Sequence, residues 1–167
     1  MTNLLVDRTR IRNSSAVDDL RRLLKELTAE VGCEEATLWV RAANGTHLDV
    51  ALNHGSSYEG FEELTQAIDG SVVGMVASMG IAQCNGPGDY HDPTIDKRVG
   101  ATTRSMVVVP VSVGQQNIGV LSAWNSVGRP QFTHEDQDVV EWRARIAGAI
   151  IRDRLGTEPA TVHVDSE

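Results

Sequence analysis

The sequence predicts an α+β domain built around an antiparallel sheet. Two turn signals predict β-hairpins, because Asn44-Gly45 tolerates positive φ and Gly114-Gln115-Gln116 separates two apolar runs. Strands joined by such turns pair antiparallel. Longer segments with helical periodicity precede the first hairpin and follow the second. Hairpin strands flanked by helices are typical of α+β domains.

The first helix is predicted to begin at Ser14 or Ser15, either of which can cap it, and to end at Gly32. The hairpin that follows pairs Ala36–Arg41 with His47–Leu52. The second of these strands alternates polar and apolar residues, which predicts that one of its faces contacts water. The apolar residues of the first helix recur at three- and four-residue steps: Val17, Leu20, Leu24, Leu27 and Val31.

The middle of the chain is expected to contain short elements and one long loop. Glu59–Ile68 is expected as a short helix, Ser71–Met79 as a second helix and Ile81–Cys84 as a short strand. The polar segment Gly86–Thr103 is predicted as a loop, and loops of this length tend to be functional or disordered. Because it contains Ile95 among polar residues, we expect it to pack over another part of the molecule.

The C-terminal part predicts two further strands and a long helix. Met106–Val113 is nearly all apolar, which suits a strand covered on both faces, and Ile118–Trp124 returns beside it. Pro110 lacks an N–H, so an interruption or a sheet edge is expected there. Thr133 and Asp136 predict a capping box at the start of the final helix.

The final helix carries two adjoining apolar stripes. A surface helix needs only one stripe to cover a core. The second stripe therefore predicts another helix beside it, either the N-terminal helix or a helix of a second subunit. One stripe comprises Val139, Trp142, Ile146 and Ile150, and the other Val140, Ala147, Ile151 and Leu155.

The bulk composition narrows the class of protein. The 167 residues fit one domain with tails, which we expect as a flexible segment 1–14, a domain 15–155 and a disordered tail 156–167. A net charge of -8 disfavours nucleic acid and anionic membranes as partners. No apolar run approaches the roughly 20 residues of a membrane span, and the N-terminus lacks a signal-peptide pattern. We therefore expect a cytoplasmic protein with Cys33 and Cys84 reduced.

Four short segments, taken in order, resemble the GAF domain family over residues 16–155. The resemblance implies a PAS-related fold with an antiparallel sheet of about six strands. It also implies that helices from both chain ends cover one face and that a small-molecule pocket lies under loops on the other. The segments are Gly74-Met75-Val76-Ala77, Arg104-Ser105-Met106 with the following Val109-Pro110-Val111, Ile118-Gly119-Val120-Leu121, and Phe132-Thr133-His134-Glu135-Asp136.

The family's best-known ligands are cyclic nucleotides, and the members that bind them carry Asn-Lys, a spacer, Phe, three residues and Asp-Glu. Ser126 and Gln137 stand where those members have Lys and Glu, so the ion pair between that Lys and the Asp has no direct counterpart. Arg129 is a candidate substitute. A cyclic nucleotide is disfavoured but not excluded, and the ligand is otherwise unknown. The positions that match are Asn125, Phe132 and Asp136.

A few GAF proteins are free methionine sulfoxide reductases, which use cysteines around the pocket. Only Cys84 lies near that region here, because Met75 and Ala101 occupy the other expected positions and Cys33 is far off. One thiol without a resolving partner can be oxidised but has no disulfide to form. The later loop also lacks the cysteine that attaches a bilin in phytochromes. We predict no enzymatic activity, with a redox enzyme or thiol sensor based on Cys84 as the less favoured alternative.

The resemblance implies ligand contacts around the predicted pocket. Arg104 could bind an anionic ligand through its planar guanidinium or form an ion pair with an acidic neighbour. Leu38 and Trp39 must point to opposite faces of the sheet. Tyr90-His91-Asp92 with Asp96 matches no standard metal spacing, and no nucleophile–base pair stands out, so no metal or catalytic residue is predicted. The expected ligand-binding residues are Trp39, Met75, Cys84, Tyr90, Ile95, Thr102, Thr103, Arg104, Ser105 and Trp124.

These features predict a sensory or regulatory module in signal transduction. Ligand binding would order the loop, and the terminal helices would carry the change to a partner protein or a second subunit. The alternative is a ligand-free module used for dimerisation and protein contacts. The homodimer interface is expected at Leu20, Leu24, Leu27, Trp142, Ile146 and Ile150.

Overall fold

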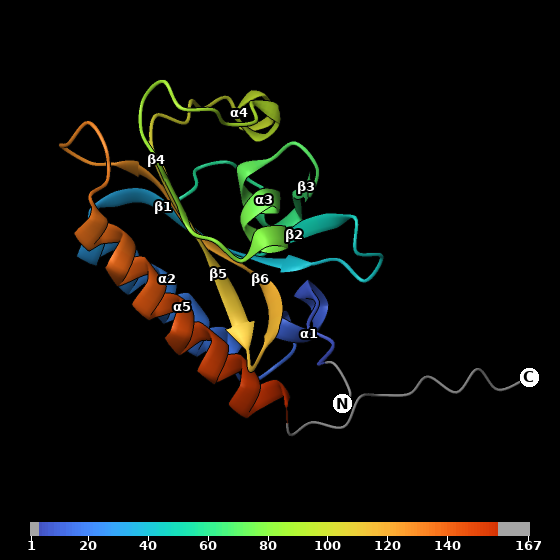
Figure 1. The fold of residues 1–167 in the computed structure, drawn as a ribbon. Coiled ribbons are helices and arrows are strands. Elements are labelled where there is room, and N and C mark those ends of the chain that lie inside the picture. The colour runs from blue at the N-terminus through green and yellow to red at the C-terminus, as the bar shows by residue number, and fades with distance from the viewer. Residues whose placement is uncertain (1–3, 157–167) are drawn as a thin grey trace, which may run out of the picture.

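The computed structural model describes residues 4–156 and has a six-stranded sheet at its centre (Figure 1). Its order is β3-β2-β1-β6-β5-β4, and every neighbouring pair is antiparallel. The predicted α+β class is therefore confirmed. The strands are β1 (Cys33–Arg41), β2 (His47–His54), β3 (Thr65–Ala67), β4 (Gln83–Asn85), β5 (Met106–Val113) and β6 (Gln116–Ser126).

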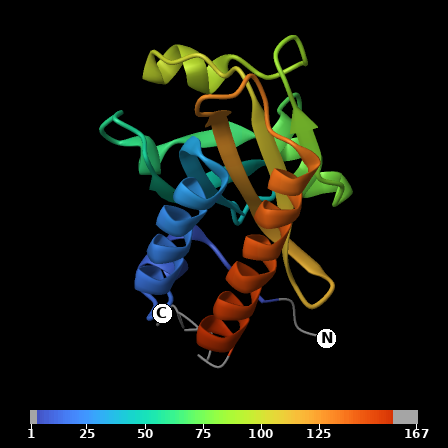
Figure 2. The same ribbon diagram turned by 90° about the vertical axis from the view of Figure 1, so that its left-hand side faces the viewer.

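Helices cover both faces of the sheet, so that two apolar cores form (Figures 1 and 2). Leu38 lies in the core on the side of α2 and α5, and Trp39 lies in the core on the side of α3, as strand alternation predicts. The helices of the first side are α1 (Arg8–Arg12), α2 (Val17–Val31) and α5 (His134–Leu155). Those of the second are the 3-10 helix η1 (Phe61–Glu63), α3 (Val72–Met79) and α4 (Thr94–Val99).

The two long helices pack side by side within one chain (Figure 2). Arg143 of α5 lies 2.9 Å from Glu26 and 2.6 Å from Glu30 of α2, which links the helices by ion pairs. The helix predicted to lie beside the second stripe of α5 is thus the N-terminal helix of the same chain. That stripe is buried: Val140, Ala147, Ile151 and Leu155.

Burial corrects half of the predicted dimer interface. Leu20, Leu24 and Leu27 are at most 1% exposed, because α2 turns them toward the sheet and α5. A second subunit cannot reach them without unfolding the chain. Trp142 is 59% exposed, and Ile146 and Ile150 are only partly buried, so these three remain at the surface of α5.

The pairing of β5 explains why a proline is tolerated inside this strand. β4 pairs with β5 only from Met106 to Val108, so Pro110 lies where β5 has no neighbour on that side. The predicted sheet edge at Pro110 is confirmed.

Thr133 and Asp136 form the predicted capping box at the start of α5. Each side chain accepts a hydrogen bond from the other residue's backbone N–H.

Three local predictions were wrong or incomplete. Glu59–Ile68 is not one helix but η1 followed by β3, because Gly60 has φ 85° and β3 pairs with β2. The segment predicted as flexible contains α1, whose Ile11 is fully buried. The segment Gly86–Thr103 contains α4, anchored by buried Ile95. Apart from Gly156, the predicted C-terminal tail lies outside the described residues.

No helix between residues 4 and 156 combines the length and the apolarity that crossing a membrane requires.

Candidate functional site

A small cavity lies between the sheet and the segment that carries α4, on the face opposite α2 and α5. Its volume is about 30 Å³, which is enough to hold a water molecule. Both α3 and the α4 segment contribute to it, so residues far apart in the sequence meet there. The walls are formed by Trp39, Gln66, Ser71, Val72, Val73, Asp92, Ile95, Asp96, Thr103, Met106 and Trp124.

The N-terminus of α3 forms one wall of the cavity. The side chain of Ser71 caps this helix and fixes its backbone there. Ser71 Oγ accepts a hydrogen bond from Gly74 N at 3.0 Å and donates one to Ala67 O at 2.7 Å. Gly74 is required here, since an added Cβ would collide with the backbone of Ile68. The cap therefore holds the start of α3 against the end of β3.

The α4 segment is held over the cavity by a few polar contacts. Asp96 accepts hydrogen bonds from both the backbone N and the Oγ1 of Thr103, each at 2.7 Å. Asp92 accepts one from Gln66 Nε2 at 2.8 Å, and Tyr90 donates one to Gly70 O at 2.8 Å. The segment is thus linked to β3, to α3 and to the start of β5.

Two tryptophans form the floor of the cavity, and their polar atoms differ. Trp39 and Trp124 lie with ring centroids 6.2 Å apart, and Phe61 meets Trp124 edge-on. Trp39 Nε1 donates a hydrogen bond to Ser122 Oγ at 3.0 Å. Trp124 is 7% exposed, and among residues 4–156 no protein atom accepts a hydrogen bond from its Nε1. A buried indole N–H ordinarily has a partner.

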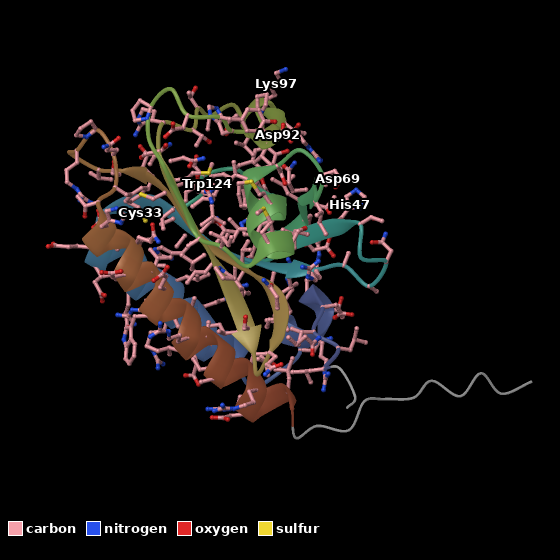
Figure 3. The ribbon with its side chains drawn as sticks, in the orientation of Figure 1. Cys33, His47, Asp69, Asp92, Lys97 and Trp124 are labelled. Atoms are coloured by element: carbon pink, nitrogen blue, oxygen red, sulfur yellow. The ribbon has the colours of Figure 1, made fainter. Side chains whose placement is uncertain are left out.

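The charges at the cavity are negative. Asp92 and Asp96 are the ionisable residues of its wall, and no Lys, Arg or His of the described chain contributes to it. The pKa of Asp92 lies below its usual value, first because the Thr94 hydroxyl donates a hydrogen bond to the carboxylate. In Figure 3, Asp92 lies between α4 and α3, whereas Lys97 projects outward.

The structure brings four of the ten expected ligand-binding residues to the cavity: Trp39, Ile95, Thr103 and Trp124. Met75 and Tyr90 lie instead at a shallow groove on the outer side of α3. Thr102 is exposed, and Ser105 is buried with its Oγ 3.2 Å from Ser126 Oγ. The residues that sequence reasoning missed are mainly Gln66, Ser71, Asp92 and Asp96.

Arg104 points away from the cavity and forms an ion pair with Glu34 at 2.8 Å, the alternative considered from the sequence. Arg104 lowers the pKa of Glu34 by donating a hydrogen bond to it. Asn125, which has φ 56°, accepts a hydrogen bond from Arg104 N at 2.7 Å and donates one to Glu34 at 3.1 Å. These contacts fix the start of β5.

Arg129 takes the place of the lysine that the cyclic-nucleotide motif would require. Its guanidinium lies 2.7 Å from Asp136 Oδ2, and it also donates a hydrogen bond to Val31 O. The pair lies at the start of α5 and is absent from the cavity wall. The match at Asn125 and Asp136 therefore corresponds to contacts that stabilise the fold.

The two thiols lie away from the cavity and are poorly suited to nucleophilic chemistry. Cys84 pairs in register with Val107 on the side of α5, where it packs against the first core. Burial raises the pKa of Cys84, and it raises that of Cys33 to about 12. Because the thiolate is the reactive form, a raised pKa disfavours the reactive form of both thiols. Within residues 4–156, no three His, Cys, Asp or Glu side chains are placed to hold a metal ion.

The fold is an α+β domain with a cavity between its antiparallel sheet and a helical segment. The GAF domain family matches residues 17–151, so the chain belongs to that family. This confirms the resemblance seen in the sequence.

Individual relatives are distant. The cone cGMP-specific 3',5'-cyclic phosphodiesterase subunit alpha' of Mus musculus is 27% identical over 81 residues, which cover 46% of this chain and only 9% of the mouse protein. A methyl-accepting chemotaxis protein fragment, residues 122 to 287, has a TM-score of 0.72 at 20% identity, covering 87% of this chain and 94% of that one.

An enzyme of the same fold is also similar. Free methionine-R-sulfoxide reductase from Neisseria meningitidis, solved with its substrate, has a TM-score of 0.68 at 20% identity and covers 87% of this chain and 83% of that one. At this identity, the two solved structures establish the fold alone.

Proposed function

We propose that this GAF domain is a sensory or regulatory module that binds a small molecule between the sheet and the α4 segment. The observation that carries the proposal is the buried Trp124 Nε1–H, which has no acceptor within residues 4–156 and belongs to a residue of the cavity wall. A ligand that accepts this hydrogen bond would remove an energetic cost of about 1–3 kcal/mol.

The α4 segment supplies the switch in this proposal. Its polar contacts reach Gln66 in β3 and Thr103 before β5. A ligand that displaces Asp92 or Asp96 from these partners would change how α4 packs on the sheet. Because a ligand shifts only states that it binds differently, this rearrangement is the signal that a partner protein would read.

A cyclic nucleotide is a weak candidate, although the mouse relative is named for cGMP. Its phosphate would meet two carboxylates and no cationic side chain at the described cavity wall. Arg104 and Arg129 are engaged by Glu34 and Asp136.

A non-enzymatic role is supported by the thiols. Cys84 lies on the opposite side of the sheet from the cavity, and its raised pKa disfavours the thiolate. The two cysteines are not bonded to each other, which favours a reducing compartment such as the cytoplasm.

The test is native mass spectrometry of the protein as purified from cells, followed by denaturation to release bound molecules. We expect a small molecule at one equivalent per chain. An empty protein that also gains no thermal stability from a metabolite library would argue against the sensor role.

The alternative is a ligand-free module for dimerisation and protein contacts. The small cavity volume favours it, as does the exposed Trp142 beside partly buried Ile146 and Ile150 on α5. An empty protein that forms a stable dimer would support this alternative.

A further inference from the structure

We propose that the outer side of α3 is a docking surface for a basic amphipathic helix of a partner protein. The surface is a groove with a volume of about 370 Å³, which we call the α3 groove. It shares only Ser71 and Val72 with the cavity wall. The residues of the α3 groove that carry the argument are Ile68, Asp69, Met75, Ser78, Met79 and Tyr90.

The outer side of α3 lacks the charged face of an ordinary surface helix. Residues 70–88 contain no Asp, Glu, Lys or Arg, although these make up 23% of the chain. A helix at a protein surface ordinarily turns charged or polar residues toward water. The exposed residues of α3 are instead Met75, Ser78 and Met79, and the two methionines are 39% and 62% exposed. A helix that is apolar on both sides is typical of one that is covered on both sides.

Tyr90 extends this apolar surface from a second segment of the chain. It is 67% exposed and lines the α3 groove, where its hydroxyl donates a hydrogen bond to Gly70 O at 2.8 Å. Exposed apolar residues that stand singly are common, whereas contiguous ones mark interaction sites. Methionine side chains adapt their shape to a partner, and apolar grooves of this kind receive the apolar face of an amphipathic helix.

The charge of the partner follows from Asp69. Asp69 is exposed between β3 and α3 and is the ionisable residue of the groove, to which no described Lys, Arg or His contributes (Figure 3). Within residues 4–156, its carboxylate accepts no hydrogen bond and forms no ion pair. A free carboxylate at the rim of an apolar groove favours a partner that places Lys or Arg beside its apolar side chains.

Charge also argues against the two other occupants of the groove. Two copies of this chain, each with a net charge of -8, repel one another, and a symmetric contact at the groove would bring two Asp69 carboxylates together. The C-terminal segment 157–167 lies outside the described residues, and its sequence has no Lys or Arg to meet Asp69. Its ionisable acidic residues are Glu158, Asp165 and Glu167.

The position of Tyr90 would let the partner read the state of the cavity, a role that rests on the proposed function. Tyr90 belongs to the α4 segment, and Asp92, two residues further on, accepts the hydrogen bond of Gln66 at the cavity. A ligand that moves this segment also moves one wall of the α3 groove. The docking itself needs no ligand, so it can be tested separately.

The experiment is an NMR titration that follows the methyl signals of the methionines at pH 7 and constant ionic strength. Met75 and Met79 report on the groove, and buried Met106 is the internal reference. The probe is a helical Leu/Lys peptide of about 14 residues with its leucines on one face. One matched peptide has Glu for every Lys. A second has the Leu/Lys composition in an order that leaves no apolar face.

We expect the amphipathic Leu/Lys peptide to move the Met75 and Met79 signals saturably and to leave Met106 in place. The other two peptides should move none of these signals. Met79→Gln should weaken the binding about tenfold, as seen at Met75, because a buried methionine contributes on this order. Asp69→Asn should weaken it about two- to fivefold, the range of an exposed ion pair.

Two control variants make the same chemical changes elsewhere. Val127→Gln removes an apolar side chain that is 58% exposed in the loop before α5. Asp138→Asn removes a carboxylate from an exposed position of α5. Both should bind the peptide like the wild type. Weakening by Asp138→Asn as large as that by Asp69→Asn would show attraction to the net charge alone and overturn the role of Asp69.

The remaining outcomes identify other occupants. Methionine signals that shift with protein concentration, without any peptide, would make a second copy the occupant and overturn the partner proposal. Movement of the Trp142 indole signal instead of Met75 and Met79 would place docking on α5 and also overturn it. If the Leu/Lys peptide moves neither methionine, the docking surface is excluded. The ligand proposal would still stand, because native mass spectrometry decides it independently.

Discussion

At the scale of single residues, polar side chains connect the ends of the elements. Asp136 is one of these, because it accepts hydrogen bonds from Thr133 N and from Arg129, which itself reaches Val31. Burial alone would raise the pKa of Asp136, but the hydrogen bonds of Arg129 and Thr133 outweigh it and the pKa lies below its usual value. The carboxylate therefore stabilises the folded state.

Replacing this carboxylate tests the argument. We expect Asp136→Asn to lower the free energy of unfolding by about 1–2 kcal/mol at pH 7, because the cap and the ion pair are both weakened. The contribution of a carboxyl with a depressed pKa is complete above its ordinary value of 3.8 and is lost as the pH falls through the lower folded value. Urea unfolding of both proteins between pH 3 and 7 measures the difference.

The matched control is Asp138→Asn, which removes the same charge from an exposed position of the same helix. A destabilisation as large as that of Asp136→Asn would contradict the specific role of residue 136. So would a difference between wild type and Asp136→Asn that does not shrink toward low pH.

At the scale of elements, α5 approaches β5 closely because of one glycine. Gly148 is buried in the middle of the helix, and an added Cβ would collide with the backbone carbonyl oxygen of Ser112 in β5. A glycine inside a helix costs about 1 kcal/mol relative to alanine. The contact of α5 with the sheet is thus obtained at a cost in helix propensity.

Gly148→Ala sets these two effects against each other. The helix gains about 1 kcal/mol in propensity, whereas overpacking a buried contact against backbone costs about 1–3 kcal/mol or more. We expect a net loss of stability, seen as a lower Tm in thermal unfolding. Arg145→Ala, at an exposed position of α5, is the control for propensity and should leave the Tm nearly unchanged. A higher Tm for Gly148→Ala would show that α5 can move away from β5.

At the scale of the whole molecule, the outer face of α5 is the part of the predicted dimer interface that remains at the surface. Trp142 is 59% exposed there, while the leucines of α2 are inside the chain. Isolated exposed apolar residues are common, so the size of the contact decides whether a dimer forms.

If the chain forms the proposed homodimer through α5, Trp142→Glu should convert it to monomers without changing its fold. Sedimentation velocity measures the mass, and circular dichroism checks the fold. Val127→Glu is the control, because Val127 is 58% exposed and lies in the loop before α5. A dimer that survives Trp142→Glu would exclude this face.

Buried Leu24 is expected to act on stability and not on association. Leu24→Ala should lower the free energy of unfolding by about 2–5 kcal/mol, the cost of a core cavity.

Most elements could be predicted because their signals are local. Helix periodicity, the cap at Thr133 and the hairpin at Asn44-Gly45 depend on neighbouring residues, and each has its counterpart in the structure. The η1 and β3 segments were mistaken for a helix because β3 is only three residues long and its strand state depends on pairing with β2. The cavity was predicted only in part, because Gln66 and Ser71 are polar residues without a distinctive motif.

The sequence by itself determined the α+β class, the family and the placement of Leu38 and Trp39 on opposite faces of the sheet. Only the tertiary structure decided that α2 fills the second stripe of α5, that Arg104 pairs with Glu34 and that Cys84 faces away from the cavity. It also brought Asp92 and Asp96 to the same cavity wall as Trp124. The physical reason is that periodicity and capping arise from contacts a few residues apart. The charge and shape of a cavity depend on segments that meet only after the chain has folded.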